Sequence, residues 1–393
     1  MWTGMWTGLL RELRYLLREK WDLAMVLLAP LLVLVLMSSI FAQGKLQHLP
    51  IALIDQDQGR LSQLIYDHLS QNHGLALLTV TDQVVEAEKL LNQNKIWGYV
   101  HIPAGAEQRL VRAQDAEISI AFNQSYFSIG NTISSAMLIS TLQAMATFTG
   151  REFLGTTLPY VEVPTPNIKI SPLYNPGLNY EFYLGPYMVP AILHLLLCCC
   201  VAFAVGQEMK RQTLTDWIKV NPTGSDPSKA SAKLEIWHAL LSKNLCYVLI
   251  FCVWTWLWML WMIEMRGWFV AGSLWMILLG QFLLYAAYAF LSTAVVLGTR
   301  DLTKSFGLLA VYGGSSLSFA GITLPLNNAP LFTQFWANII PFTPYAKLQT
   351  EQWVVGSTVW ISLQPLSILV LYVTLYGGLA YLLLRKIVRE VQT

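Results

Sequence analysis

The sequence predicts an α-helical membrane protein with six transmembrane helices and an inserted external α/β domain. Three observations lead to this fold class. Of the 393 residues, 55% are hydrophobic and 12% are charged, whereas a typical soluble domain has about 25% charged residues. Several apolar runs are long enough to cross a bilayer. After the first of them, residues 43–182 change to a pattern in which strands alternate with helices.

Each membrane span needs roughly 20 apolar residues, because the hydrocarbon core of a bilayer is about 30 Å thick. Proline residues inside two of the predicted spans, Pro30 and Pro190, are compatible with membrane helices. The predicted spans are residues 21–42, 183–206, 243–263, 269–298, 305–325 and 361–384.

The distribution of Lys and Arg predicts that both termini are cytoplasmic. With that orientation, the inner segments 1–20, 207–243, 299–304 and 385–393 carry four, six, two and three basic residues. The two short outer segments carry one each, Arg266 and Lys347. Basic residues in short loops favour the cytoplasmic side, so residues 43–182 are expected outside the cell membrane. The predicted location is the inner (plasma) membrane.

Residues 1–20 are predicted to form an amphipathic elbow helix that lies at the membrane interface. One face is apolar and the opposite face carries Arg11, Arg14 and Arg18, which suits anionic lipid headgroups. An amphipathic helix in a soluble setting is the alternative. The apolar face consists of Leu9, Leu10, Leu13, Leu16 and Leu17.

The external domain is predicted to contain a largely parallel sheet. Its strands are expected in PIALIDQD, LALLTV, IWGYVHIP and EISIAFN, with helices between them. A long helix, FSIGNTISSAMLISTLQAMATFTGREFLG, and a Pro-rich linker from Pro159 to Tyr180 then lead to the second span.

No enzyme or metal site is predicted in the external domain. Asp55, Asp57 and Gly59 resemble the start of a calcium loop, but the closing glutamate is missing. Capping of the following helix is the better interpretation of these residues. Neither the histidines nor the five cysteines of the chain have the spacing of a zinc site, and the sequence has no G-x-S-x-G motif.

The loop at residues 207–242 is longer than a connector between two spans requires, and it carries a short predicted helix. Leu214, Trp217 and Ile218 share one face of this helix, and Asn221-Pro222 ends it. A helix with an aromatic anchor suits docking into a groove of another protein. The same pattern also fits a helix that lies on the bilayer.

The order of motifs around this loop resembles that of the ABC-2 type exporter permeases. Gly206-x-Glu208, Gln212-Thr213-Leu214, Asn221-Pro222 and Lys243 resemble the signature that follows their second span. The segments IALIDQDQGRLSQ, SPLYNPGLNYEFYLGPYMVP and LSFAGITLPLNNAPLFTQFWANIIPFTPYAKLQTEQWVVG resemble further blocks of the family in the same order. The resemblance therefore covers nearly the whole chain.

The resemblance implies that the short helix is a coupling helix, which docks on cytoplasmic ATPase subunits. The docking residues that it implies are Glu208, Thr213, Leu214, Trp217, Ile218 and Pro222. The chain departs from the family at three positions: Gln207 replaces the usual arginine, Gln212 stands where a glycine is common, and Trp217 is bulkier than the typical residue.

Other chains are expected to bind ATP and Mg²⁺, because the sequence has no G-x-x-x-x-G-K-[ST] motif. The chain itself is expected to need no cofactor and to be no enzyme. The expected partners are ABC ATPase subunits, a second permease copy or a related permease, and membrane lipids. A periplasmic membrane-fusion protein is a further candidate, and nothing points to nucleic acid.

Polar and small residues in the spans are candidates for a substrate path. His194 in the second span is equally compatible with a bond to a neighbouring helix. The other candidates, Tyr312, Ser315, Ser316 and Ser318, lie in a stretch of small residues that also favours close helix packing. Residues 325–358 are predicted to form a re-entrant segment, with Lys347 and Glu351 spaced for an ion pair.

The predicted function is that of a permease subunit of an ATP-driven ABC exporter. Its substrate would be a hydrophobic or amphiphilic compound, such as a drug, a lipid or a lipid-linked molecule. The alternative is a mechanotransmitting ABC subunit that drives periplasmic partners without carrying substrate itself. An ion-coupled transporter is disfavoured, because no Asp or Glu lies near the middle of a predicted span.

Overall fold

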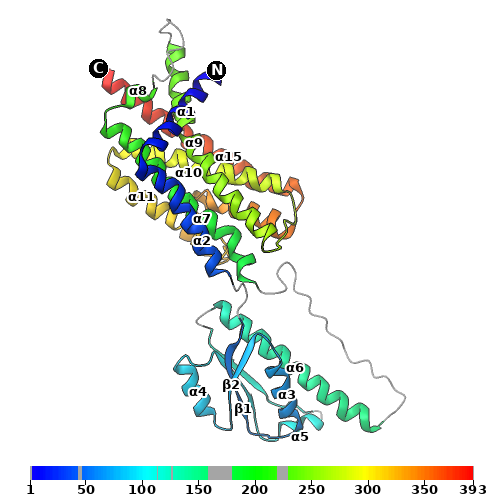
Figure 1. Cartoon of the computed structure of the whole chain (residues 1–393). Coiled ribbons are helices and arrows are strands. Elements are labelled where there is room, and N and C mark those ends of the chain that lie inside the picture. Colours follow the sequence, from blue (N-terminus) through cyan, green and yellow to red (C-terminus); the bar gives the residue numbers. More distant parts are fainter. Residues whose placement is uncertain are drawn as a thin grey trace. The chain divides into compact units, whose positions relative to one another are not determined.

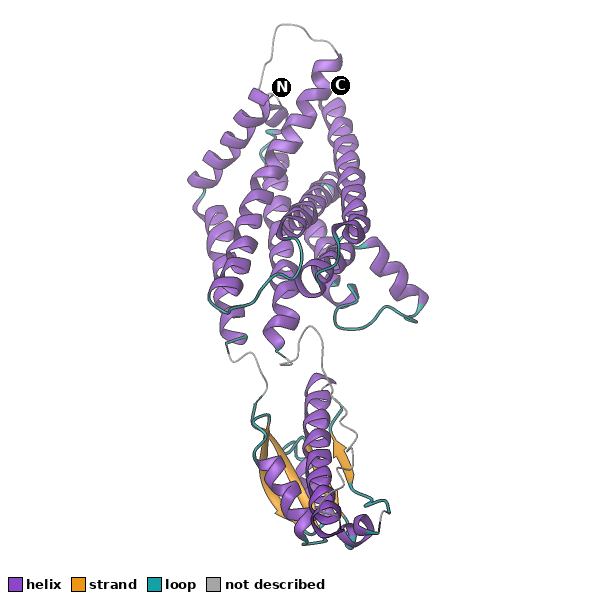
Figure 2. Ribbon diagram, turned by 90° about the vertical axis from the view of Figure 1, so that its right-hand side faces the viewer, coloured by secondary structure: helices purple, strands orange, loops and turns teal. Residues whose placement is uncertain are grey.

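The computed structural model describes residues 2–42, 47–112, 114–124, 127–157, 179–218 and 229–392. The chain divides into two compact units (Figure 1). The first consists of Met1–Ala42 and Glu181–Thr393, and the second of Gln43–Tyr180. The first unit is built from helices, and the strands belong to the second unit (Figure 2).

Within the residues that the structure describes, five helices of the first unit are long and apolar enough to cross a membrane. Together with the shorter helices they form one bundle (Figure 1). These five helices make the chain a multi-pass membrane protein. They are α2 (Lys20–Ile40), α7 (Tyr180–Lys210), α9 (Lys229–Glu264), α10 (Leu274–Thr299) and α15 (Val359–Gln392).

The fifth predicted span, residues 305–325, is an interrupted helix. It consists of α11 (Leu302–Gly314) and α12 (Ser316–Phe319), which are separated at Ser315. Two glycines precede this break, and glycine has a low helix propensity. The two helices together are about 27 Å long at the usual helical rise, close to the thickness of a hydrocarbon core. The count of six spans therefore remains a prediction.

The long helices differ in how much of their surface the chain itself covers. The most apolar part of α7 is 67% buried, whereas that of α2 is 22% buried and that of α15 is 17% buried. α7 therefore lies inside the bundle, and α2 and α15 expose leucine side chains at its surface. Such apolar surfaces suit contact with lipid tails or with another membrane subunit.

The predicted re-entrant segment contains three short helical elements. They are α13 (Leu331–Ile339), α14 (Phe342–Gln349) and the π-helical turn η1 (Thr350–Val355). The predicted ion pair between Lys347 and Glu351 is wrong. Lys347 donates to Gln364, and Glu351 accepts from Ser362, because both side chains turn toward α15 instead of along their own helix.

The second unit is a four-stranded sheet covered by helices on both faces. The strand order is β2-β1-β3-β4; β1 pairs in parallel with β2 and β3, and β3 pairs antiparallel with β4. α3 and α6 pack on one face and α4 on the other (Figure 1). The elements are β1 (Leu49–Asp55), α3 (Arg60–Ser70), β2 (Leu75–Thr81), α4 (Val84–Asn92), β3 (Gly98–Ile102), α5 (Ala106–Val111), β4 (Ser119–Phe122) and α6 (Phe127–Thr157).

Asp57, which lies two residues after β1, is held by backbone groups of another segment. Asp57 accepts from the backbone N–H groups of Gly105 and Glu107 at 2.7 and 3.0 Å. Glu107 in turn accepts from the backbone N–H of Leu61 at 3.1 Å. Asp57 thus caps α5, and Glu107 caps α3. The prediction that the acidic residues at positions 55 and 57 cap α3, the helix directly after them, is therefore wrong.

Candidate functional site

The candidate site lies where the N-terminal helix α1 (Trp2–Arg18) packs on α9 and where its Arg11 reaches Glu208 at the end of α7. Gly8, Glu12 and Leu16 are buried, and their spacing of four residues places them on one face of α1. A Cβ atom on Gly8 would lie only 2.4 Å from Ser242 Oγ on α9. The glycine therefore allows the two helices to approach closely. Leu13 and Leu17 remain exposed, as expected of a face turned to lipid.

Lys243 on α9 is the centre of a buried ion cluster. Its Nζ lies 2.7 and 2.8 Å from the two carboxylate oxygens of Glu12, and 3.2 Å from Oε1 of Glu208 on α7. The Lys243 and Glu12 side chains are 3% and 5% exposed. Tyr247 donates a further hydrogen bond to Glu12. Buried charges require such pairing, because each one loses its hydration.

Glu208 connects this cluster to the short helix α8 (Leu214–Ile218). It accepts a hydrogen bond from the Thr213 hydroxyl, and its backbone carbonyl accepts from the Thr213 N–H at 3.0 Å. Arg11 lies 3.8 Å from Glu208 and donates to the backbone carbonyl of Asp216 at 3.0 Å. α8 is therefore tied to α1, α7 and α9 by polar contacts.

The turn before α8 contains a left-handed residue. Gln212 has a φ of 56°, a region that glycine adopts more readily than residues with a side chain. This is the position at which a glycine is common in the family that the sequence resembles. Gln212 therefore replaces the family's common glycine at a position where the backbone geometry favours glycine.

The apolar face of α8 packs on its own chain. Leu214, Trp217 and Ile218 are buried, the indole N–H of Trp217 donates to the backbone carbonyl of Ala239 at 3.3 Å, and Lys243 Nζ lies 5.3 Å from the centre of the Trp217 ring. The expectation that this face enters a groove of another protein is thus corrected: α9 already occupies it.

The outward side of this region is polar. Arg211, Gln212 and Asp216 are exposed. Of the predicted docking residues, Glu208 and Thr213 lie in the polar contacts beneath α8. Pro222 lies outside the described residues.

His194, the first candidate for a substrate path, joins two helices. It is fully buried on α7, with its ring nitrogens 3.1 Å from the carbonyl of Pro190 and 3.2 Å from that of Gly313 on α11. Its ring also lies 4.2 Å from that of Tyr288. Of the two sequence-based interpretations, this geometry favours the bond to a neighbouring helix.

The remaining path candidates divide between internal contacts and one exposed position. Tyr312 donates to the carbonyl of Ile339 and bonds the Tyr376 hydroxyl. Ser316 is buried and bonds the Tyr288 hydroxyl at 2.7 Å, and Ser315 accepts from the Trp336 indole at 2.9 Å. Ser318 is exposed. The structure therefore brings the first three into helix contacts and leaves Ser318 on the surface of this chain.

Sequence reasoning missed Glu12 and Tyr247. Glu12 is the only acidic residue in the segment before Glu19, and its spacing with Gly8 and Leu16 was a readable signal for a helix contact. Lys243 was noted as part of a family motif without a structural role. Its partner Glu12 could not be predicted from the sequence, because the two residues lie 231 positions apart.

Comparison with known proteins identifies the family. The chain matches the model of the ABC-2 family transporter proteins over residues 20–382. It is 23% identical over 225 residues to the probable multidrug ABC transporter permease YbhR of Escherichia coli K12, and equally to YbhR of E. coli O157:H7. The alignment spans 56% of this chain and 58% of each relative's length. No solved structure matches significantly. Because the family model spans most of the chain, this multi-pass membrane protein belongs to the ABC-2 transporter family.

Proposed function

We propose that the chain is the permease subunit of an ATP-driven ABC exporter for a hydrophobic or amphiphilic compound. Separate cytoplasmic ATPase subunits, which bind ATP and Mg²⁺, supply the energy. Family membership supports the subunit type, and similarity to a probable multidrug permease supports a small amphiphilic substrate. In this proposal both termini are cytoplasmic, residues 43–182 face outward, and the chain lies in the inner membrane with six spans.

The observation that carries this proposal is the anchoring of α8. A five-residue helix has little stability of its own, yet the Lys243 cluster and the buried Trp217 hold it to three longer helices. We place the ATPase contact on the exposed side of α8, at Arg211, Gln212 and Asp216. Motion of a docked ATPase would then pass directly to α1, α7 and α9.

A second permease copy would complete the membrane part. Gly307, Ala310 and Gly314 on α11 and Ser318 on α12 are exposed small residues, which permit close approach of another membrane helix. Measuring the mass of the purified complex tests this part of the proposal. A complex with one permease copy would contradict it.

Co-purification with the ATPase tests the proposed function. The tagged full-length chain is expressed together with a candidate ABC ATPase subunit, and retained ATPase is quantified. Asp216→Arg is expected to reduce retention at least about tenfold with no loss of thermal stability, since Asp216 is exposed. Trp217→Ala is expected to reduce both retention and stability, since it unseats α8.

The matched control is Asp67→Arg, at a partly exposed helix position in the second unit. It is expected to leave retention unchanged. Equal retention by the wild type and Asp216→Arg would contradict docking through α8, and a stable permease that is active without any ATPase would contradict the function as a whole.

A mechanotransmitting subunit is the second candidate. It is favoured by the internal bonding of Tyr312, Ser315 and Ser316, which closes part of the predicted path within this chain. Substrate uptake into inverted vesicles distinguishes the two functions. ATP-dependent accumulation of a compound supports the exporter, whereas ATP hydrolysis without accumulation supports the transmitter.

A further inference from the structure

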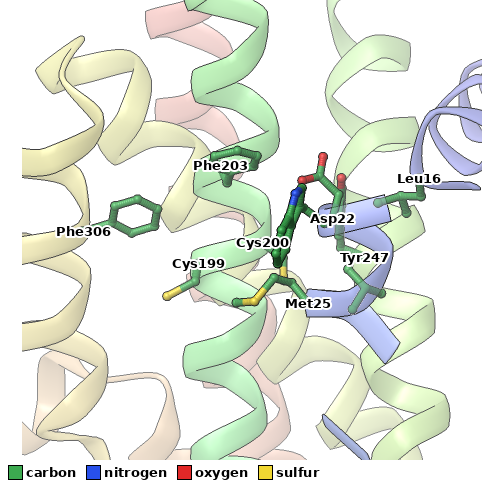
Figure 3. A pocket seen from close by; sticks show the side chains of 10 residues that line it. Leu16, Asp22, Met25, Cys199, Cys200, Phe203, Tyr247 and Phe306 are labelled. Atoms are coloured by element: carbon green, nitrogen blue, oxygen red, sulfur yellow. The ribbon is translucent and has the colours of Figure 1, made fainter. Parts of the chain in front are cut away.

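A cavity of about 260 Å³ lies between α1, α2, α7, α9 and α11 (Figure 3). Aromatic side chains from several helices line it: Trp21 on α2, Phe203 on α7, Tyr247 on α9 and Phe306 on α11. Among the described residues that line it, Asp22 is the only acidic one. An apolar cavity with one charged group is typical of a site that selects its ligand by that group.

The cavity opens toward the surface of the bundle along α2. Trp21 is 86% exposed and Met25 is 46% exposed, whereas Val26 and Tyr247 on the inner side are buried. Trp21 and Asp22 stand in the first turn of α2. A tryptophan at the end of a membrane helix is typical of the level of the lipid headgroups. The opening therefore faces the place where the head of an amphiphile would lie, with its tail among the lipids.

The surroundings of Asp22 are negative on balance. The nearby charges that act on its carboxylate are Glu19, Glu12 and Arg211. Arg211 lies 3.3 Å from Glu19, and Glu12 is paired with Lys243. Among the described residues, no lysine or arginine is within ion-pair distance of Asp22. Burial, and next the Asp22 carboxylate, raise the pKa of Tyr15 to about 12, and its uncharged hydroxyl forms a hydrogen bond with Asp22.

We propose that this cavity binds the head of a monocationic aromatic or quaternary-ammonium amphiphile, with Asp22 as the counter-charge and the aromatic side chains as its walls. Aromatic faces attract quaternary ammonium groups. The volume of about 260 Å³, just below the usual range of ligand pockets, fits a one-ring or two-ring head. A phospholipid is disfavoured, because its phosphate would face the carboxylates of Asp22 and Glu19.

This inference deepens the proposed export function, since it names a substrate class, and it rests on that function only for the fate of the ligand. Binding itself requires no ATPase. It can therefore be measured on the purified permease, and its failure is distinguishable from a failure of ATPase docking.

The test uses melting of the full-length protein in detergent, followed with a thiol-reactive fluorophore. Four of the five cysteines are buried and the fifth is only partly exposed, so the dye reports unfolding. Benzyldimethyldodecylammonium is titrated as the probe, with dodecylbenzenesulfonate as an anion that has a similar tail and ring. A ligand that binds the folded state raises the melting temperature with its concentration. The cation is expected to do so and the anion is not.

Asp22→Asn is expected to weaken binding of the cation by up to about fivefold, the effect of losing one partly shielded charge pair. Met25→Trp, which fills the cavity without changing charge, is expected to weaken it as well and keeps the test valid if Asp22→Asn fails to fold. The control Glu264→Gln removes an exposed carboxylate of the same unit and is expected to leave binding unchanged. Equal stabilisation by the cation and the anion, or an unchanged affinity in both cavity variants, would overturn the proposal.

Discussion

At the scale of single residues, Lys243 is the central side chain of the candidate site. It forms ion pairs with both Glu12 and Glu208, which belong to different helices, and it lies against the Trp217 ring. Because the cluster is buried, its charges are stable only while all of them are paired. Removal of one partner leaves an unpaired buried charge, which lowers the free energy of unfolding. The same residue therefore supports both the fold of this region and the position of α8.

Lys243→Met is expected to lower the free energy of unfolding by about 3–5 kcal/mol, because it leaves the Glu12 carboxylate buried without a counter-charge. Adding Glu12→Gln is expected to recover part of this loss. Thermal unfolding of the purified chain measures both effects. Lys304→Met is the control: its side chain is 75% exposed, and a change within about 0.5 kcal/mol is expected. A Lys243→Met variant as stable as this control would contradict the cluster.

Gln212 offers a second test at the same scale. Because its φ is 56°, Gln212→Gly is expected to raise stability by up to about 1 kcal/mol, whereas Gln212→Val is expected to lower it. Melting temperatures of the two variants give the comparison. Equal melting temperatures of the glycine and valine variants would contradict a left-handed backbone at position 212.

At the scale of elements, the sequence predicted the positions of the helices well, but it did not predict their contacts. The apolar face of α8 was correctly located at Leu214, Trp217 and Ile218, all of which are buried. Its partner was not predictable, since periodicity shows that a face is apolar but not which surface covers it. The same limit applies to Lys347 and Glu351, whose spacing permits a pair within one helix although α15 supplies their actual partners.

The capping residues of the second unit give a prediction for elements. Asp57→Ala is expected to destabilise that unit by about 1–2 kcal/mol, because two backbone N–H groups of the α5 segment lose their acceptor. Addition of EDTA to the wild type is expected to leave its melting unchanged, since these carboxylate oxygens are already held by backbone groups. A marked loss of stability in EDTA would restore the calcium loop that the sequence pattern left as the alternative.

At the scale of the whole molecule, composition and the lengths of the apolar runs were sufficient to predict a multi-pass helical membrane protein. Five of the predicted spans correspond to long helices. The remaining one is interrupted at Ser315 beside two glycines, and hydropathy does not register such breaks because it averages over a window. The ion cluster at Lys243 could not be predicted from the sequence for a different reason: it joins residues that lie far apart in the chain.

Photo-crosslinking from α8 in intact cells measures directly whether α8 docks on the ATPase. The full-length chain carries benzoylphenylalanine in place of Asp216, or, as the control, in place of Leu375 on the exposed surface of α15, and is expressed with its ATPase. A crosslink to the ATPase is expected from position 216 and none from position 375. Absence of that product from position 216, with the permease and ATPase both present and the complex active, would contradict the claim that α8 is the docking element.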